Sequence, residues 1–195
     1  MASDLDQATC ARIREGDAEA VDEVVTRDYN VADLLAHAAA GACGPGDTVT
    51  HAWTLLISDI AQGRITCGLR AALLARVITV LEDRNLLDDS EVAASKPYSF
   101  SPPQDDRWAG WWEIDPPTWP ASVELTAAVV LRALRRVPII PRIILVLRDA
   151  AKISVTDVES ILQRDEPRQI ALLDAAREEY VFAIDTQIAT EKEMT

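Results

Sequence analysis

The sequence lacks the features that would place a chain of this size in a membrane or outside the cell. It has no run of about 18 apolar residues, the minimum for a membrane-spanning helix. The opening stretch MASDLDQATCARIREGD does not show the basic and then apolar order of a secretion signal. Because 49% of the residues are hydrophobic, we expect a folded chain, located in the cytoplasm.

Cysteine and histidine are also scarce. The three cysteines, Cys10, Cys43 and Cys67, are widely spaced and form no CxxC pair. Only His37 and His51 could join them in a metal site. The spacing therefore predicts small buried hydrophobic side chains, with neither a metal nor a redox centre, and no cofactor is expected.

The third shortage is of positive charge. Lys and Arg number 19 against 32 Asp and Glu, which gives a formal net charge of −13. Nucleic-acid binding depends on cations that neutralise phosphates, so this balance argues against it, although a local basic patch stays compatible with it. A glycine-rich phosphate loop, an HExxH motif and a nucleophile elbow are all absent, so nothing in the sequence demonstrates catalysis.

Apolar residues recur with the period of an α-helix over most of the chain, without the clean alternation of strands. This pattern predicts an all-α fold. Residues 1–86 contain several such segments and form the first expected domain. Between the first two segments, Gly16 and Asp17 are a C-cap and N-cap pair.

Residues 87–120 break the helical pattern. They hold most of the prolines and four of the five tryptophans, Trp108, Trp111, Trp112 and Trp119. A flexible tether would be polar and rich in Gly and Ser, so we expect this linker to pack on a domain. Alternatively, the tryptophans line a pocket for a small molecule.

Helical periodicity returns over residues 121–188, the second expected domain, with Ser122 as its first cap. Ser154 and Asp157 resemble a capping box, and Asp165 is expected to cap the last long helix. The two helices that begin there have helix-turn-helix spacing. Residues 189–195 are expected to fray.

The order of these segments resembles the extracytoplasmic-function (ECF) sigma factors, two-domain members of the bacterial sigma-70 family. IREGDAEAVDEVVTRDY is similar to the family's opening helix pair, DTVTHAWTLLISDI to its polymerase-binding helix, and GLRAALLARVITVLEDRN to its promoter-melting helix. RWAGWWEIDPPTW resembles the linker of one subgroup. LRRVPIIPRIILVLRDAAKISVTDVESIL and RQIALLDAAR resemble its helix-turn-helix. The resemblance covers nearly all of the chain and implies a region 2-like domain (1–86), a linker (87–120) and a region 4-like helix-turn-helix domain (121–188).

The departures from the family pattern fall on positions that contact DNA. In the last helix, positions that are usually basic in the family carry Ile170, Asp174, Ala175, Glu179 and Val181. Lost cations and gained carboxylates both oppose binding to the phosphate backbone. We therefore expect this helix not to recognise a promoter −35 element.

The promoter-melting segment has changed in the same way, with Ala72, Thr79, Val80 and Glu82 at the family's Trp, Asn and Arg positions. Melted bases need aromatic platforms and cations, which these residues do not supply.

The polymerase-binding segment is closer to the family pattern. It retains Asp47 and Trp53, while Thr50 and His51 replace the usual Gln and Asp. Binding to core RNA polymerase is therefore expected to be weakened but not excluded.

The replacements are apolar as well as uncharged, which predicts covered surfaces. We expect the domains to close on each other, with the Ile170 face near the Val80 face or the linker tryptophans. A cavity left by closure would favour an apolar ligand, with Asp174 or His51 as the first candidate acid or base. More simply, Asp174 is an exposed charge and His51 replaces a family carboxylate. Besides the four tryptophans, the predicted ligand or partner surface comprises Ala72, Ala75, Val80, Ile170, Ala171, Leu173 and Ala175.

Three functions remain open. The first is a sigma-like protein that has lost the ability to bind promoter DNA and acts by binding a protein, either an anti-sigma factor or core RNA polymerase. The second is a sigma fold repurposed to bind a hydrophobic small molecule, including a cofactor-independent enzyme of a biosynthetic pathway. The third is a divergent working sigma factor. Under the first two, no DNA binding is expected, and no membrane role is expected under any of them.

Overall fold

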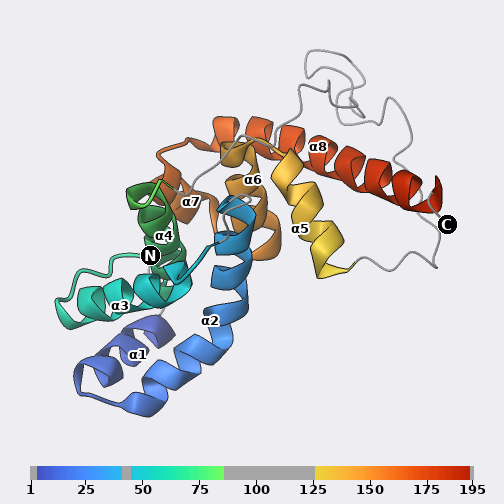
Figure 1. The fold of residues 1–195 in the computed structure, drawn as a ribbon. Coiled ribbons are helices and arrows are strands. Elements are labelled where there is room, and N and C mark those ends of the chain that lie inside the picture. The colour runs from blue at the N-terminus through green and yellow to red at the C-terminus, as the bar shows by residue number, and fades with distance from the viewer. Residues whose placement is uncertain (1–3, 41–44, 86–125, 194–195) are drawn as a thin grey trace.

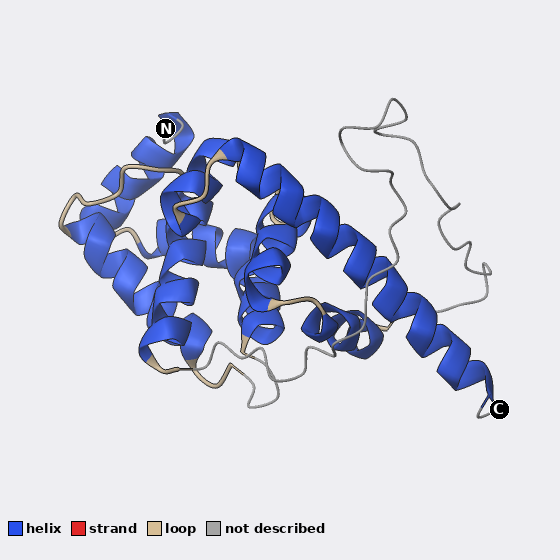
Figure 2. Ribbon diagram, turned by 90° about the horizontal axis from the view of Figure 1, so that it is seen from above, coloured by secondary structure: helices blue, strands red, loops and turns tan. Residues whose placement is uncertain are grey.

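The computed structural model describes residues 4–40, 45–85 and 126–193. These residues form helices and their connections, with no strand among them, which confirms the all-α prediction (Figure 2). No helix in the described part of the chain is long and apolar enough to cross a membrane. In chain order, the elements are α1 (Asp4–Arg14), α2 (Ala18–Ala39), α3 (Thr48–Ala61), α4 (Leu69–Asp83), α5 (Ala127–Arg136), α6 (Ile139–Leu145), the π-helix η2 (Val146–Ala150), α7 (Val155–Leu162) and α8 (Glu166–Glu193).

The predicted caps explain several helix starts. The Asp17 carboxylate accepts hydrogen bonds from the backbone N–H groups of Glu19 and Ala20 at the start of α2. Ser154 accepts one from the backbone of Asp157 at the start of α7, at 3.1 Å. Each bond satisfies an N–H group that has no partner within its own helix.

Two helix ends differ from the sequence prediction. Thr126 caps α5 through the backbone N–H of Val129, whereas the predicted cap Ser122 lies outside the described residues. Helix α8 continues to Glu193, although fraying was expected from residue 189. Its second half is supported by packing, because Ala183, Ile184 and Ile188 form a small buried cluster with Ala133 of α5.

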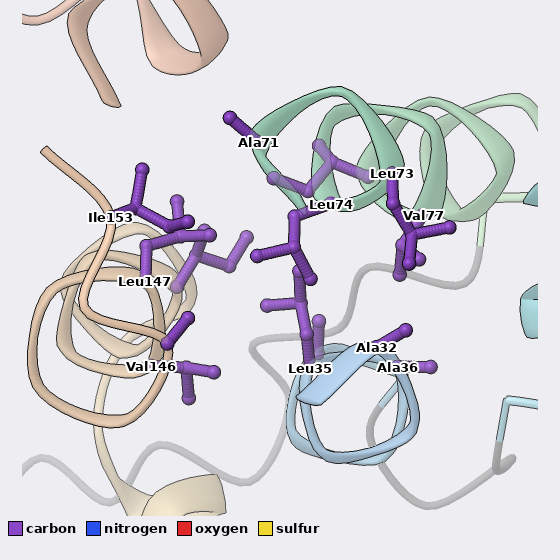
Figure 3. Close-up of a cluster of buried hydrophobic side chains, with 14 of the residues drawn as sticks. Ala32, Leu35, Ala36, Ala71, Leu73, Leu74, Val77, Val146, Leu147 and Ile153 are labelled. Carbon is purple, nitrogen blue, oxygen red and sulfur yellow. The ribbon is translucent and has the colours of Figure 1, made fainter. Parts of the chain in front are cut away.

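Residues on both sides of the predicted linker share one hydrophobic core. Leu35 of α2 and Leu74 of α4 point toward Leu147 of η2, with Val146 and Ile153 beside it (Figure 3). All five side chains are buried. The N-terminal half (residues 4–85) and the C-terminal half (126–193) are therefore packed together through apolar side chains, as expected from closure.

A buried arginine ties the two halves together. Arg142 on α6 is only 1% exposed. Its guanidinium donates to the carbonyls of Ala38 (2.9 Å), Arg135 (2.9 Å) and Val137 (2.8 Å). Ala38 lies in the last turn of α2, and Arg135 and Val137 lie at the end of α5. Since helix C-termini carry unpaired carbonyls and partial negative charge, this one cation compensates two helix ends at once.

Helix α8 lies across the C-terminal half and contacts α5, α6 and α7 (Figure 1). It follows α7 through a turn in which Gln163 has a left-handed backbone conformation, with a φ of 52°. The buried Gln169 amide donates to the carbonyls of Val155 (3.0 Å) and Arg164 (2.7 Å). These bonds hold the start of α8 against α7.

Candidate functional site

The apolar positions of the predicted promoter-melting helix α4 are inside the protein. Val80 is 2% exposed and Ala72 is 8% exposed, while Ala75 is half-buried. Helix α4 packs against α2, α3 and α7. Ala72 and Val80 are therefore part of the core and not of a free partner surface.

The corresponding face of α8 is open. Ile170 is 47% exposed, and Ala171, Asp174 and Ala175 are exposed beside it. Leu173 is the exception, because it is buried in the main core. The expectation that the Ile170 face meets the Val80 face is wrong, since one is solvent-exposed and the other is enclosed. The four linker tryptophans lie outside the described residues.

Neither of the two candidate acid–base residues lines the groove or the two hollows described below. His51 is exposed on α3, with its Nδ1 3.4 Å from a guanidinium nitrogen of Arg84. Arg84 also pairs with Asp47. Asp174 is exposed on α8, 3.5 Å from Arg177. Neither arrangement desolvates the group or presents it to a bound molecule.

The predicted polymerase-binding residues lie on α3 or at its start. Asp47 and Thr50 are exposed, and Trp53 is half-buried. The indole Nε1 of Trp53 is enclosed and has no hydrogen-bond partner among the described residues. Ile57, one helical turn beyond Trp53, is 38% exposed. This helix therefore keeps an outward face with apolar character.

An apolar groove at the junction of the two halves was not predicted at these residues. Its volume is about 320 Å³. Four elements build it: α2 contributes one side chain, and α5, the α6–η2 segment and α8 contribute the others. The lining residues are Leu34, Val130, Leu134, Leu145, Val146, Asp149, Ala150, Arg177, Tyr180 and Val181.

The π-helix η2 forms one wall of this groove. The backbone N–H of Ala151 donates to the carbonyl of Val146, five residues back, at 2.9 Å. The wider turn carries Val146, Asp149 and Ala150 into the lining. Such turns are rare and often occur at functional sites. The segment VLRDA contains no Gly or Pro that would signal the turn in the sequence.

The charged groups of the groove neutralise each other. Arg177 donates from Nε and Nη2 to the two carboxylate oxygens of Asp149, both at 2.8 Å. This bidentate hydrogen bonding lowers the pKa of Asp149 and raises that of Arg177. Burial raises the pKa of Tyr180, so its hydroxyl is neutral near pH 7 and can donate or accept a hydrogen bond. The lining thus suits binding of an apolar molecule better than proton transfer at neutral pH.

Two further hollows have different character. One, of about 270 Å³, shares Leu34 and Val130 with the groove and adds His37 and Asp33. The His37 Nδ1 lies 3.0 Å from the backbone carbonyl of Asp33. This hollow extends the groove along α2 and α5.

The other hollow, of about 360 Å³, is polar and lies beside Arg27, Arg70 and Lys152. The buried Asp28 accepts hydrogen bonds from both Arg27 (2.6 Å) and Arg70 (2.8 Å). Because these two cations already share a carboxylate, the arrangement resembles a structural ion-pair network more than a phosphate site.

The prediction of buried cysteines is confirmed for Cys10 and only in part for Cys67. Cys10 is buried and Cys67 half-buried, both as free thiols whose pKa is raised by burial. Cys43 lies outside the described residues. The described residues contain no group of three or more His, Cys, Asp or Glu side chains that could hold a metal ion.

Comparison with known proteins found no protein-family model, no curated protein and no solved structure that matches this chain.

Proposed function

We propose that this chain is a relative of ECF sigma factors that no longer binds promoter DNA and acts by contact with a protein of the transcription machinery. One asymmetry supports this proposal. In the helix that resembles the promoter-melting element, α4, the apolar face is enclosed by neighbouring helices, whereas the helix that resembles the polymerase-binding element, α3, keeps an open face with apolar character.

Enclosure of α4 opposes a role in DNA melting. A helix that captures unstacked bases must present side chains to them. Here the apolar face of the helix is in the core: Leu73, Leu74, Val77 and Leu81 are fully buried. Freeing α4 would expose all of this apolar surface, at about 25 cal/mol per Å².

Apart from Arg168 in its first turn, the open face of α8 offers little positive charge for DNA. Its exposed residues include the carboxylate of Asp174. The nearby cation Arg177 is bound to Asp149 and lies 3.5 Å from Asp174. Phosphates would have to displace these carboxylates, which removes most of the electrostatic gain of binding.

The open face of α3 offers the contact surface. Thr50, Thr54 and Ile57 are exposed at helical spacing, beside the half-buried Trp53. A mixed apolar and hydroxyl stripe on a rigid helix suits a protein partner. Core RNA polymerase is the first partner to test, and an anti-sigma factor is the second.

The test uses purified core RNA polymerase and labelled promoter DNA. We expect Ile57→Glu to weaken polymerase binding by about tenfold or more, as for a central interface residue. Ile170→Glu, at the other exposed isoleucine, is the matched control and should leave binding unchanged. Fluorescence anisotropy at low salt should show at most weak binding to duplex and bubble DNA.

Two results would contradict the proposal. One is a sub-micromolar, steeply salt-dependent affinity for promoter DNA, which would favour the hypothesis of a divergent working sigma factor. The other is the absence of binding to both core polymerase and any co-encoded anti-sigma factor.

A second candidate function is binding of an apolar small molecule. The groove between α2, α5, η2 and α8 favours it, because its volume and lining match those of ligand sites. This function is compatible with the first, since the groove and the α3 face use different residues.

A further inference from the structure

We propose that the groove binds a small uncharged molecule of about two fused or linked rings that carries one hydrogen-bonding group. This inference rests on the second candidate function and is independent of the contact through α3. It assigns the ligand class from three properties of the groove: its size, its π turn and its charge.

The size of the groove selects the occupant. An apolar cavity of about 150 Å³ holds one benzene molecule. The groove, at about 320 Å³, has room for roughly twice that.

The π turn is an independent sign of a built site. It replaces the ordinary helical bonds of residues 146–150 with a wider ring, closed by the bond from Ala151 to Val146. Such turns are rare and are frequently found at functional sites. Here it places Asp149 against Arg177 and Ala150 at the edge of the groove.

The charge of the groove selects a neutral ligand. The ion pair of Arg177 with Asp149 leaves no net charge in the lining, and the chain as a whole carries −13. An anion would have to compete with Asp149 for Arg177. A cation would gain little, because Asp149 is already neutralised. Tyr180, which packs against both buried clusters, supplies a neutral hydroxyl as hydrogen-bond partner.

The experiment measures binding of 1-naphthol, a neutral two-ring probe, to the full chain by equilibrium dialysis, with 1-naphthoate as the matched anion. We expect saturable binding with a Kd on the order of 100 µM for a ligand of this size. Binding of 1-naphthoate should be about tenfold weaker, because its carboxylate loses water without gaining a free cation.

Matched variants locate the site. Ala150→Trp places a large side chain in the groove from an exposed position, and should weaken 1-naphthol binding by about tenfold or more. Ala175→Trp makes the same change on an exposed position of α8 outside the lining, and should have no effect. Val181→Trp is a second blocking variant, and circular dichroism checks that each variant is folded.

The proposal is overturned if 1-naphthol does not bind at its solubility limit, or if all variants bind it equally. Stronger binding of 1-naphthoate would overturn the choice of a neutral ligand. Sedimentation of the same proteins tests whether a second copy of the chain occupies the groove. A dimer that Ala150→Trp dissociates would show that the second copy, and not a small molecule, is the occupant. Failure of polymerase binding would leave every one of these outcomes unchanged.

Discussion

Helix α4 and the first half of α8 are alike in the sequence but differ in the exposure of their apolar residues in the structure. Both carry apolar residues at positions where the proposed resemblance to sigma factors implies groups that contact DNA. Val80 on α4 is enclosed, whereas Ile170 on α8 is nearly half exposed. The difference shows that replacing DNA-contacting groups with apolar ones does not by itself mean that a face is covered.

The cause of the difference is the number of neighbours. Helix α4 contacts α2, α3 and α7, which bury its apolar face and leave open the side that carries Arg76, Thr79 and Glu82. The start of α8 leans on α7 through Gln169 and on the core through Leu173, which leaves its other side to the solvent. A single exposed isoleucine is common on protein surfaces and does not require a partner.

The largest expected effect concerns Arg142, the arginine that joins the two halves. Arg142→Ala removes the donors to three carbonyls at two helix ends. Because those carbonyls stay buried without partners, we expect a loss of about 4 kcal/mol in the free energy of unfolding, measured in urea. The exposed Arg132→Ala on α5 is the control and should change it by less than about 0.5 kcal/mol. An equal loss in the free energy of unfolding for the two variants would show that the packing of the two halves does not depend on Arg142.

A direct test of the comparison truncates one residue on each helix. Val80→Ala should reduce the free energy of unfolding by about 2 kcal/mol, because it leaves a cavity in the core. Ile170→Ala should change it by less than about 0.5 kcal/mol. Thermal and urea unfolding both report the difference. A large cost for Ile170→Ala would mean that its side chain is covered in solution.

A third test asks whether added cations allow the open face of α8 to bind DNA. Ile170→Arg combined with Asp174→Arg changes the charge by +3 and should raise affinity for duplex DNA by about tenfold, with a steeper salt dependence. Gln7→Arg with Glu15→Arg makes the same charge change on exposed positions of the N-terminal half. If this control gains as much affinity in anisotropy titrations, net charge and not the α8 face is responsible.

The smallest expected effect is a pH dependence of the groove. The pairing with Arg177 lowers the pKa of Asp149 below that of the unfolded chain. The contribution of this ion pair to the stability of the fold is therefore complete above the ordinary carboxyl pKa of about 3.9. It is lost as the pH falls through the lower pKa that Asp149 has in the folded chain. Asp149→Asn should cost about 0.5 kcal/mol at pH 7, since the pair is partly exposed, and this difference should vanish in strong acid. A difference that stays constant down to pH 2 would assign the effect to packing.

The sequence predicted the helices well because caps and periodicity are local. Asp17 and Ser154 cap the helices they were expected to cap, since their hydrogen bonds reach only two or three residues. The end of α8 was mispredicted because Ile184 and Ile188 depend on Ala133, which is distant in the sequence. Tertiary packing, and not helix propensity, extends this helix.

The groove could not be predicted for a related reason. It combines Leu34, Val130 and Tyr180 from three distant segments, and each is an ordinary apolar helix residue in the sequence. The π turn carries no Gly or Pro signal, and the pair of Asp149 with Arg177 spans 28 residues. Sequence reasoning offered Asp174 as a candidate acid beside the simpler interpretation of an exposed charge, which the structure has, and it missed Asp149.

The bond from Arg142 to Ala38 also sets an order of events during synthesis, because these residues are 104 positions apart. At about 5–20 residues per second, the ribosome delivers Arg142 roughly 5–20 s after Ala38. Throughout that interval the last carbonyls of α2 have no guanidinium, and the apolar side of α4 that later meets η2 has no cover. The nascent N-terminal half therefore exposes apolar surface of the kind that chaperones bind until the C-terminal half has been synthesised.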